Sequence, residues 1–173
     1  MNEEIEVKIL EIDKEKIKRI LEENNAELIK KVFQKNYVYE NIYTKENKIL
    51  VRIRDEGKDV FITVKGPSIL KDNLKIREEL EFNVKNENKI KRMIELMGFK
   101  NTKYYEYKRE YFKLNGCIVE IIEAPKIPIF LELEGNKDEI VVAAKLLGYK
   151  EKDFFNGKIN DKYEAYTNNL RFE

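Results

Sequence analysis

With 173 residues, the chain is long enough for one domain with a sizeable core and too short for two, so we expect a single domain over residues 1–173. Its 42% hydrophobic content excludes a disordered chain, and its net charge of +1, from 34 basic and 33 acidic residues, provides no global field for nucleic acid or an anionic membrane. Without histidine, and with Cys117 as the single cysteine, the chain cannot use Ser-His-Asp or Cys-His catalysis, an internal disulfide or a cysteine zinc cluster, which leaves carboxylates and hard cations.

Strands and helices alternate irregularly along the chain. Residues 4–11 alternate between charged and apolar side chains, which predicts a strand, and an apolar stripe with helical spacing then runs from Asp13, the expected N-cap, to Asn24 and Asn25. Further strands are predicted at 31–43, 49–55, 59–65, 75–84, 104–114, 117–122 and 129–134. Further helices are predicted at 87–97, 139–149 and 161–170. This order favours an α+β fold with a mostly antiparallel sheet, and the recurrence of strand, helix and strand over 75–114 hints at a duplicated half.

We expect a cytoplasmic protein without a membrane or nucleic-acid partner. No apolar run approaches the roughly 18 residues of a membrane span, and Met1 is followed by Asn2, Glu3 and Glu4 rather than by a signal peptide. The tyrosines between residues 104 and 111 lie among basic residues, as base-stacking side chains do, but strand propensity explains them equally well.

Polar side chains occupy one parity of nearly every predicted strand, and apolar side chains occupy the other. The polar parity consists of Glu4, Glu6, Lys8, Arg52, Arg54, Thr63, Lys65, Arg77, Glu79, Glu81, Glu120, Glu132 and Glu134. The simplest interpretation is a sheet with one face in water. That interpretation does not account for the repeated choice of arginine in a lysine-rich chain, nor for acids that come in pairs.

A closed barrel explains this choice better. If the apolar parity faces outward under the helices, the charged parity lines a tunnel. Such a lining is costly unless cations neutralise the glutamates and a polyanion neutralises the basic residues. We therefore expect a closed antiparallel β-barrel of about eight strands with helices outside, which binds Mg²⁺ or Mn²⁺ together with phosphate.

The opening Glu4-Ile5-Glu6-Val7-Lys8 resembles the Glu-x-Glu-x-Lys motif of the CYTH superfamily, the triphosphate tunnel metalloenzymes. Further matches follow in family order: Arg52-Ile53-Arg54, Thr63-Val64-Lys65, Arg77-Glu78-Glu79-Leu80-Glu81, Arg109 before Tyr111, Leu114-Asn115-Gly116 and Phe130-Leu131-Glu132-Leu133-Glu134. They span residues 4–134, and Tyr163 falls in the expected C-terminal helix. The resemblance is closest to the class IV adenylyl cyclase-like branch, whose relatives include inorganic triphosphatases and thiamine triphosphatases.

The resemblance also implies roles for these residues. The metal ligands would be Glu4, Glu6, Glu132 and Glu134, with Glu79 and Glu81 in a metal or structural role. The triphosphate would be held by Lys8, Arg52, Arg54, Lys65, Arg77 and Arg109. The candidate catalytic residues are Glu4, Glu6, Lys65, Glu120, Glu132 and Glu134.

The chain departs from the family pattern at two positions. Tyr107 stands where a lysine is common, and neighbouring Lys108 could substitute for it after a shift. Ile122 stands where an aspartate is usual, and its role could pass to Glu120 on the same face, or to Glu123 through a bulge.

The function expected from this resemblance is the conversion of ATP to cyclic AMP and pyrophosphate. The alternative is hydrolysis of inorganic, thiamine or nucleoside triphosphate, since the same lining serves both reactions. A second alternative is a non-catalytic module that binds nucleotide or polyphosphate. The oligomeric state is open between a monomer and a homodimer.

Overall fold

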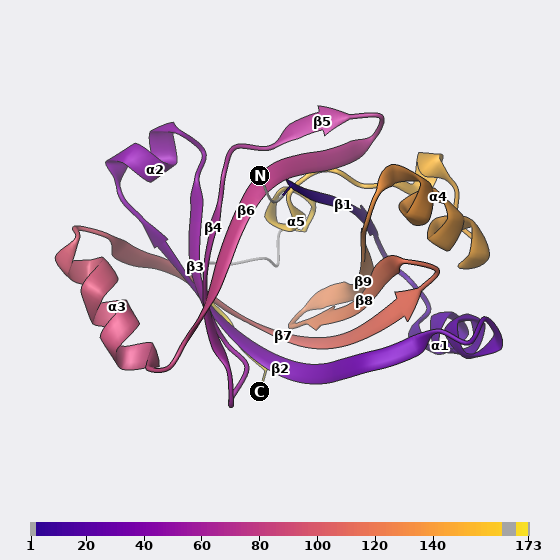
Figure 1. The fold of residues 1–173 in the computed structure, drawn as a ribbon, viewed down its shortest axis with the longest axis horizontal. Helices are drawn as coiled ribbons and strands as arrows, with labels where there is room; N and C mark the ends of the chain where they lie inside the picture. Colours follow the sequence, from indigo (N-terminus) through magenta and orange to yellow (C-terminus); the bar gives the residue numbers. More distant parts are fainter. Residues whose placement is uncertain (1–2, 164–168, 173) are drawn as a thin grey trace.

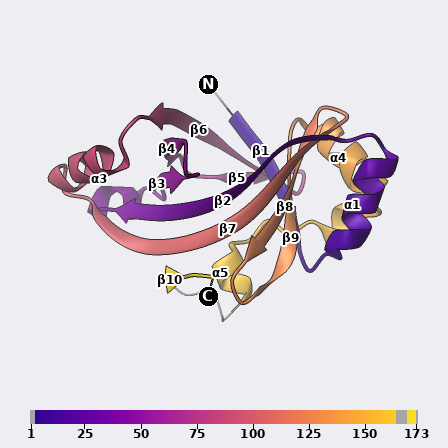
Figure 2. The same ribbon diagram turned by 90° about the horizontal axis from the view of Figure 1, so that it is seen from below.

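Eight antiparallel strands close into a barrel in the computed structural model, which describes residues 3–163 and 169–172 (Figures 1 and 2). Around the ring the order is β1, β9, β8, β7, β2, β3, β4 and β6, and β6 pairs with β1 to close it. The barrel strands are β1 (Glu3–Ile9), β2 (Glu27–Glu40), β3 (Leu50–Asp55), β4 (Val60–Lys65), β6 (Leu74–Val84), β7 (Lys100–Leu114), β8 (Cys117–Ala124) and β9 (Ile127–Glu134). The expected α+β barrel is confirmed.

Helices flank the barrel on its outer side. The four outer helices are α1 (Lys14–Glu23), α2 (Ile42–Glu46), α3 (Glu87–Leu96) and α4 (Lys137–Leu146). A 3-10 turn (Glu151–Asp153) and α5 (Ile159–Lys162) follow towards the C-terminus. Of the helices in the described residues, none is both long and apolar enough to span a membrane.

The first helix illustrates how the local sequence sets an element. The Asp13 side chain accepts a hydrogen bond of 3.0 Å from the backbone N–H of Lys16, which satisfies a free donor of the first turn. The helix ends at Asn24, and Asn25 takes the left-handed conformation with φ of 53°. The predicted N-cap and stop are therefore both confirmed.

The apolar parity of the strands faces outward and forms the core beneath the helices. Val7 and Ile9 of β1 are buried in one cluster with Ile17 of α1 and Ile140 of α4. A second outer cluster forms where Ile94 of α3 packs over β3. The charged parity consequently faces the interior of the barrel, as the closed-barrel interpretation predicted.

The strand predicted at 31–43 begins earlier and ends sooner than expected. It extends back to Glu27, whereas Tyr43 lies in α2. Asn41 caps this short helix in a reciprocal capping box with Thr44, and that local signal outcompetes the strand propensity of the aromatic residues. A short strand that we did not predict, β5 (Ile69–Lys71), pairs with β6 outside the ring.

The terminal helix predicted at 161–170 is wrong at its C-terminal end. The helix α5 covers only Ile159–Lys162, and Leu170 belongs to β10 (Asn169–Leu170), which pairs in parallel with β7. Residues 164–168, including Tyr166, lie outside the described residues. The buried side chain of Leu170 packs on the sheet, because tertiary contacts override a weak helical pattern.

Candidate functional site

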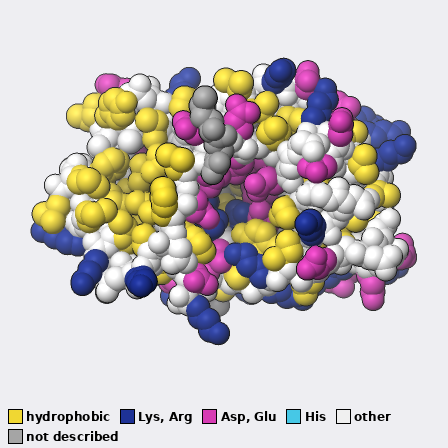
Figure 3. All heavy atoms as spheres, in the orientation of Figure 1, with side chains coloured by type: hydrophobic (Ala, Val, Ile, Leu, Met, Phe, Trp, Pro, Cys, Tyr) yellow, Lys and Arg dark blue, Asp and Glu magenta, His cyan; other side chains and the backbone are white. Residues whose placement is uncertain are grey.

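A cavity of about 360 Å³ lies inside the barrel and opens to the surface in a hollow lined with acidic and basic side chains (Figure 3). Its lining residues are Glu4, Glu6, Lys8, Lys30, Leu50, Arg52, Arg54, Lys65, Lys75, Arg77, Glu79, Glu81, Tyr105, Tyr107, Arg109, Tyr111, Glu120, Glu132, Glu134 and Ile159. All thirteen site residues predicted from the sequence are in this set. The structure thus brings them together around one space.

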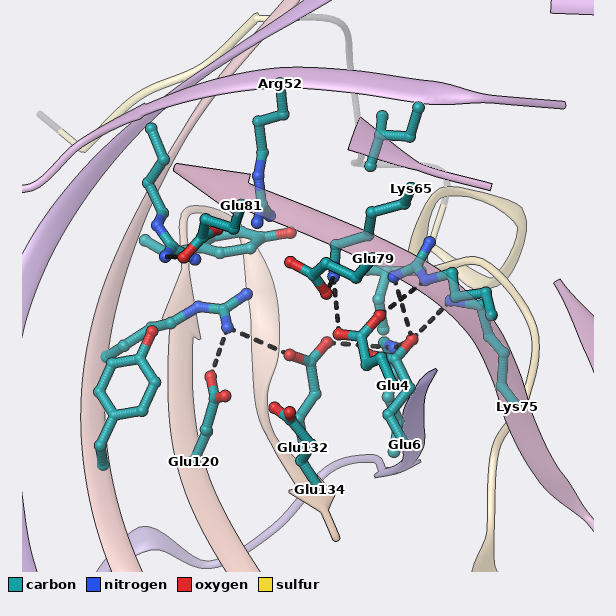
Figure 4. A pocket seen from close by; sticks show the side chains of 18 of the residues that line it. Glu4, Glu6, Arg52, Lys65, Lys75, Glu79, Glu81, Glu120, Glu132 and Glu134 are labelled. Atoms are coloured by element: carbon teal, nitrogen blue, oxygen red, sulfur yellow. Dashed lines mark hydrogen bonds and ion pairs between the residues drawn. The ribbon is translucent and has the colours of Figure 1, made fainter. Parts of the chain in front are cut away.

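The first cluster of ion pairs joins β1, β4 and β6, where the barrel closes. Glu4 lies directly opposite Arg77, and Lys65 lies opposite Glu79 in the strand register. The Lys65 Nζ atom is 2.6 Å from the Glu4 carboxylate and 2.7 Å from that of Glu79, and Arg77 Nε donates to Glu4 at 2.8 Å (Figure 4). Lys65 is therefore shared between acids of β1 and β6, and Arg77 links β6 to β1.

The second cluster joins β1, β7, β8 and β9. The Glu132 carboxylate is 3.1 Å from Lys8 Nζ and 3.2 Å from an Arg109 nitrogen, and Arg109 also pairs with Glu120. Burial disfavours the charged form of Glu132, but the nearby Lys8 and Arg109 lower its pKa to about 2. Glu132 is thus a permanently ionised group at neutral pH.

The third cluster surrounds Arg54 on β3. Its guanidinium donates to Glu81 at 2.8 Å and lies 3.2 Å from the carboxylate of Glu56. Glu56 also accepts a 2.8 Å hydrogen bond from Lys30. Glu56, which directly follows β3, is almost fully buried at its side chain and contacts Arg54 and Lys30 of the cavity lining.

Two lining groups, Arg52 and Glu134, differ from the rest because they have no ionic partner among the described residues. Arg52 is only 6% exposed, its Nε has no hydrogen-bond partner, and the phenol of Tyr105 is its polar neighbour. Burial and the nearby carboxylates of Glu120 and Glu4 raise the pKa of Glu134 to about 8. Because β3 and β9 lie across the ring from each other, Arg52 and Glu134 enter the cavity from opposite walls (Figure 4).

The lining carboxylates fit a hard divalent cation that binds together with phosphate. Within the described range, no group of three carboxylates is positioned to hold a metal ion by itself, because most are paired with lysine or arginine. An anionic ligand that draws those cations to itself would release carboxylate oxygens on the β1 and β9 walls. Oxygen-only donors supplemented by phosphate and water are what Mg²⁺ and Mn²⁺ take. Among the lining carboxylates, Glu134 would gain most from a bound metal ion, because it has no lysine or arginine partner in the described residues.

The two departures from the family pattern lie together in one buried apolar cluster, of which Tyr107 lines the cavity. Ile122 is fully buried, and the ring of Tyr107 packs edge-on against Phe130 with centroids 6.3 Å apart. Ile159 and Leu170, from the C-terminal segment, complete this inner apolar cluster. A carboxylate in place of Ile122 would be buried among apolar groups, which costs free energy. The apolar side chain of Ile122 avoids this cost.

The contacts of Glu120, Glu123 and Lys108 show which of these three residues could replace the side chains that are usual in the family. Glu120 lines the cavity and pairs with Arg109, whereas Glu123 pairs with Lys14 of α1 on the outside of the barrel. The Lys108 ammonium lies 4.5 Å over the ring of Phe172 and does not line the cavity. Of the three substitutes, only Glu120 reaches the site.

Sequence reasoning missed several cavity residues. Lys75 lines the wall and pairs with Glu6, and it shares the inward parity of Arg77, so the alternation itself could have identified it. Tyr111, whose phenol accepts a 2.9 Å hydrogen bond from Gln34, follows the inward parity of Arg109 in the same way. The sequence around Ile159 gives no indication that it lines the cavity, because the fold of the C-terminal segment brings it there.

The fold and the cavity define a class of barrel proteins with an ionic interior. The CYTH domain model matches residues 2–152. A protein of Methanocaldococcus jannaschii, named "Putative adenylate cyclase MJ0240", is 32% identical over 146 residues, which are 83% of each chain. The chain therefore belongs to the CYTH domain family, the triphosphate tunnel family.

Solved structures share the same fold. PH1012 from Pyrococcus horikoshii is 28% identical, with a TM-score of 0.78 and coverage of 91% of this chain and 98% of that one. A Hippeastrum protein, described as "Putative adenylyl cyclase HpAC1" that reveals a dominant triphosphatase activity, is 16% identical, with a TM-score of 0.66 and coverage of 94% of this chain and 95% of that one. At that identity the second likeness is one of fold alone.

Proposed function

We propose that this protein is a metal-dependent enzyme that acts on a triphosphate inside the barrel, with ATP converted to cyclic AMP and pyrophosphate. The observation that carries the proposal is Arg52, a buried guanidinium aimed into the cavity without a carboxylate partner among the described residues. A buried cation of this kind calls for an anion. The name of the 32% identical M. jannaschii relative supports adenylate cyclisation.

The basic side chains account for substrate binding. Arg52 and Arg54 project from β3, and each guanidinium can donate two parallel hydrogen bonds to phosphate oxygens. Lys8 and Arg109 approach from β1 and β7, so a triphosphate would receive positive charge from several walls. Ion pairs already orient Lys8, Arg54 and Arg109, which reduces the reorganisation needed as negative charge moves to the leaving group.

Glu4, Glu6, Glu132 and Glu134 would hold Mg²⁺ or Mn²⁺, which supplies polarisation of the phosphoryl group when bound. In cyclisation, the ribose 3′-oxygen forms a bond to the α-phosphorus, the bond to the β-phosphate oxygen breaks, and pyrophosphate departs. The 3′-hydroxyl proton passes to a carboxylate or to water. The arginines hold the departing pyrophosphate, whose charge increases during the step.

Hydrolysis is the second candidate reaction, and the composition of the lining favours it. Most of the lining side chains are ionic, and Leu50 and Ile159 are the aliphatic ones. Inorganic triphosphate needs only the charges, whereas a nucleotide also needs space for its base and ribose. The same basic residues would then hold a triphosphate while an aligned water attacks the terminal phosphorus.

Product analysis separates these reactions. Purified protein would be incubated with ATP, inorganic triphosphate or thiamine triphosphate, each with Mg²⁺ or Mn²⁺, and the products resolved by anion-exchange chromatography. Cyclic AMP with pyrophosphate supports cyclisation, and orthophosphate release supports hydrolysis. Calorimetric binding of all three without turnover would leave only a non-catalytic binding module. Absence of binding would refute the triphosphate site itself.

A further inference from the structure

The charged lining of the cavity is divided between two halves of the barrel. The neighbouring strands β7, β2, β3 and β4 contribute only basic side chains to the charged lining that the structure describes. We call these side chains the basic wall: Lys30, Arg52, Arg54, Lys65 and Arg109. The lining carboxylates come from β6, β1, β9 and β8, and Figure 4 shows Glu132 and Glu134 across the cavity from Arg52. A polyanion inside the barrel therefore gains most next to the basic wall.

Lys30 is the member of the basic wall that comes from β2, which lies between β7 and β3 in the ring. None of the triphosphate-binding residues implied by the family pattern lies on this strand. Lys30 lies opposite Tyr111, which also lines the cavity. The next residue, Lys31, pairs at 3.0 Å with Glu110 on the outer side of β7. Strand β2 thus presents Lys30 to the cavity and Lys31 to the outer surface.

Glu56 holds Lys30 from behind the basic wall. The Glu56 side chain is only 5% exposed and is not part of the cavity lining. Its carboxylate accepts one 2.8 Å hydrogen bond from Lys30 Nζ and another from the amide of Gln34. The guanidinium of Arg54 lies 3.2 Å from the same carboxylate. Glu56 therefore contacts two cations of the basic wall without facing the cavity itself.

The turn after β3 fixes the position of Glu56. The backbone N–H of Glu56 donates to the carbonyl of Asp59 at 2.8 Å, and the N–H of Gly57 donates to the Asp55 side chain at 2.7 Å. Gly57 has a φ of 86°, which glycine adopts without the steric cost that a side chain would bring. The local sequence of this turn thus sets where the carboxylate of Glu56 lies.

The Lys30 ammonium retains donors for a ligand. Its Nζ atom lies 4.7 Å from the ring centroid of Tyr111 and 6.0 Å from that of Phe61, and aromatic faces attract a cation at such distances. Among the described residues, its carboxylate partner is Glu56. An ammonium has three N–H groups, so Lys30 can bond Glu56 and still donate to phosphate oxygens.

We propose that Lys30 is a further triphosphate-binding residue and that Glu56 is the positioning residue that holds it in the basic wall. Lys30 adds a positive charge on β2, between Arg109 on β7 and Arg54 on β3. The phosphates then lie along β7, β2 and β3, across the ring from the carboxylates of β1 and β9 that would hold the metal ion. This inference rests on the proposed function, because it requires a triphosphate in the cavity.

Binding of an uncleavable ligand tests the role of Lys30. The probe is inorganic triphosphate with methylene groups in place of both bridging oxygens, offered with Mg²⁺ and measured by isothermal titration calorimetry. Lys30→Met should weaken its affinity about 10-fold at low salt, because a hydrogen bond between charged groups is lost, and the loss should shrink at high salt. Lys31→Met is the matched control, because it removes the same charge from the adjacent residue on the outer side and should leave the affinity nearly unchanged.

A double-mutant cycle tests the role of Glu56. Glu56→Asp keeps the negative charge but shortens the side chain, so it should weaken the affinity by withdrawing the carboxylate from Lys30. In the Lys30→Met background the same substitution should have a smaller effect, because the ammonium that it positions is absent. A carboxylate that only stabilises the fold would change the affinity equally in both backgrounds. Thermal melting shows whether each variant is folded, and Glu56→Gln replaces Glu56→Asp in the cycle if the latter is not.

The outcomes separate this inference from the proposed function. If the wild type does not bind the analogue, the triphosphate site is refuted, and this inference with it. If the wild type binds and Lys30→Met binds equally well, the triphosphate site stands and the role of Lys30 is overturned. Equal losses in Lys30→Met and Lys31→Met would reflect net charge alone and would overturn it too. Equal effects of Glu56→Asp in both backgrounds would overturn the positioning role of Glu56.

Discussion

Glu4 and Arg77 face each other across β1 and β6, the strand pair that closes the barrel, and their side chains form a 2.8 Å ion pair inside the cavity. The seam of the barrel is therefore also a wall of the site. Any substitution that disturbs this wall acts on both folding and ligand binding. The most informative substitutions are consequently those at lining residues whose charges are not shared across the seam.

Arg52→Ala is expected to weaken triphosphate binding about 10-fold to 100-fold, since hydrogen bonds to charged groups contribute about 1.5–3 kcal/mol. Stability should change little, because Arg52 holds no carboxylate partner in the described structure. Isothermal titration calorimetry measures the affinity, and the loss should shrink at high salt. Lys108→Ala is the control, because Lys108 lies outside the cavity. An unchanged triphosphate affinity in Arg52→Ala would show that Arg52 is not part of the site.

Glu132→Gln should lower metal-dependent turnover at least about 100-fold, because it removes a charge from the ionic wall. It should also destabilise the fold by about 3 kcal/mol, because Lys8 and Arg109 lose a shared buried counterion. Urea unfolding measures the second effect. Glu78→Gln is the control, because Glu78 lies on the outer side of β6. Full activity in Glu132→Gln would contradict the role proposed for Glu132 in turnover.

Glu134→Gln is expected to have the opposite effect on stability. Glu134 lacks a cation and is surrounded by other carboxylates, so an uncharged amide relieves repulsion and leaves the melting temperature unchanged or raised. Turnover should still fall, because a metal ligand would be lost. Calorimetric melting in the presence of a chelator provides the measurement. A clearly lowered melting temperature would show that Glu134 has a stabilising partner.

Glu110 provides a pH-dependent contribution to stability on the outer side of β7. Burial disfavours its charge, but ion pairs with Lys14, Lys18 and Lys31 lower its pKa from 4.5 to about 2. A lowered pKa stabilises the fold above pH 4.5, and this stabilisation is lost as the pH falls from 4.5 towards 2. Glu110→Gln should therefore be less stable than wild type at pH 7, with the difference shrinking over that range. If the urea midpoints of the two proteins differ equally at all pH values, the lowered pKa of Glu110 is not the cause of the difference. Glu46→Gln is the control, because Glu46 is exposed.

Ile122→Asp tests the buried apolar cluster beside the cavity by introducing the carboxylate that is usual in the family. The side chain would be buried beside Tyr107 and Phe130, so we expect a loss of about 3 kcal/mol or more in the free energy of unfolding. Ile122→Val, the control, should cost about 1 kcal/mol. A stable aspartate variant with increased turnover would instead show that this cluster accommodates a charge.

The amino-acid sequence by itself determined which side chains share a face. Side chains alternate strictly along a strand, so most of the inward set could be derived strand by strand, and twelve of the thirteen residues derived in this way line the cavity, Thr63 being the exception. Arg109, which also lines the cavity, was assigned through the family resemblance. The cap and stop of α1 are equally local, because Asp13 and Asn24 act on backbone groups within a few residues. The direction of the charged face followed from its choice of residues, since arginines and paired acids are unusual on a solvated sheet.

Tertiary structure alone decided which charges are paired. Glu132 meets Lys8 more than a hundred residues away in the chain, and such pairs depend on the register between strands, which closure of the ring sets. The same register left Arg52 and Glu134 without ionic partners in the described structure. The path of the C-terminal segment, which brings Ile159 to the cavity, was likewise decided by packing, because a burial site formed by distant strands has no local signal.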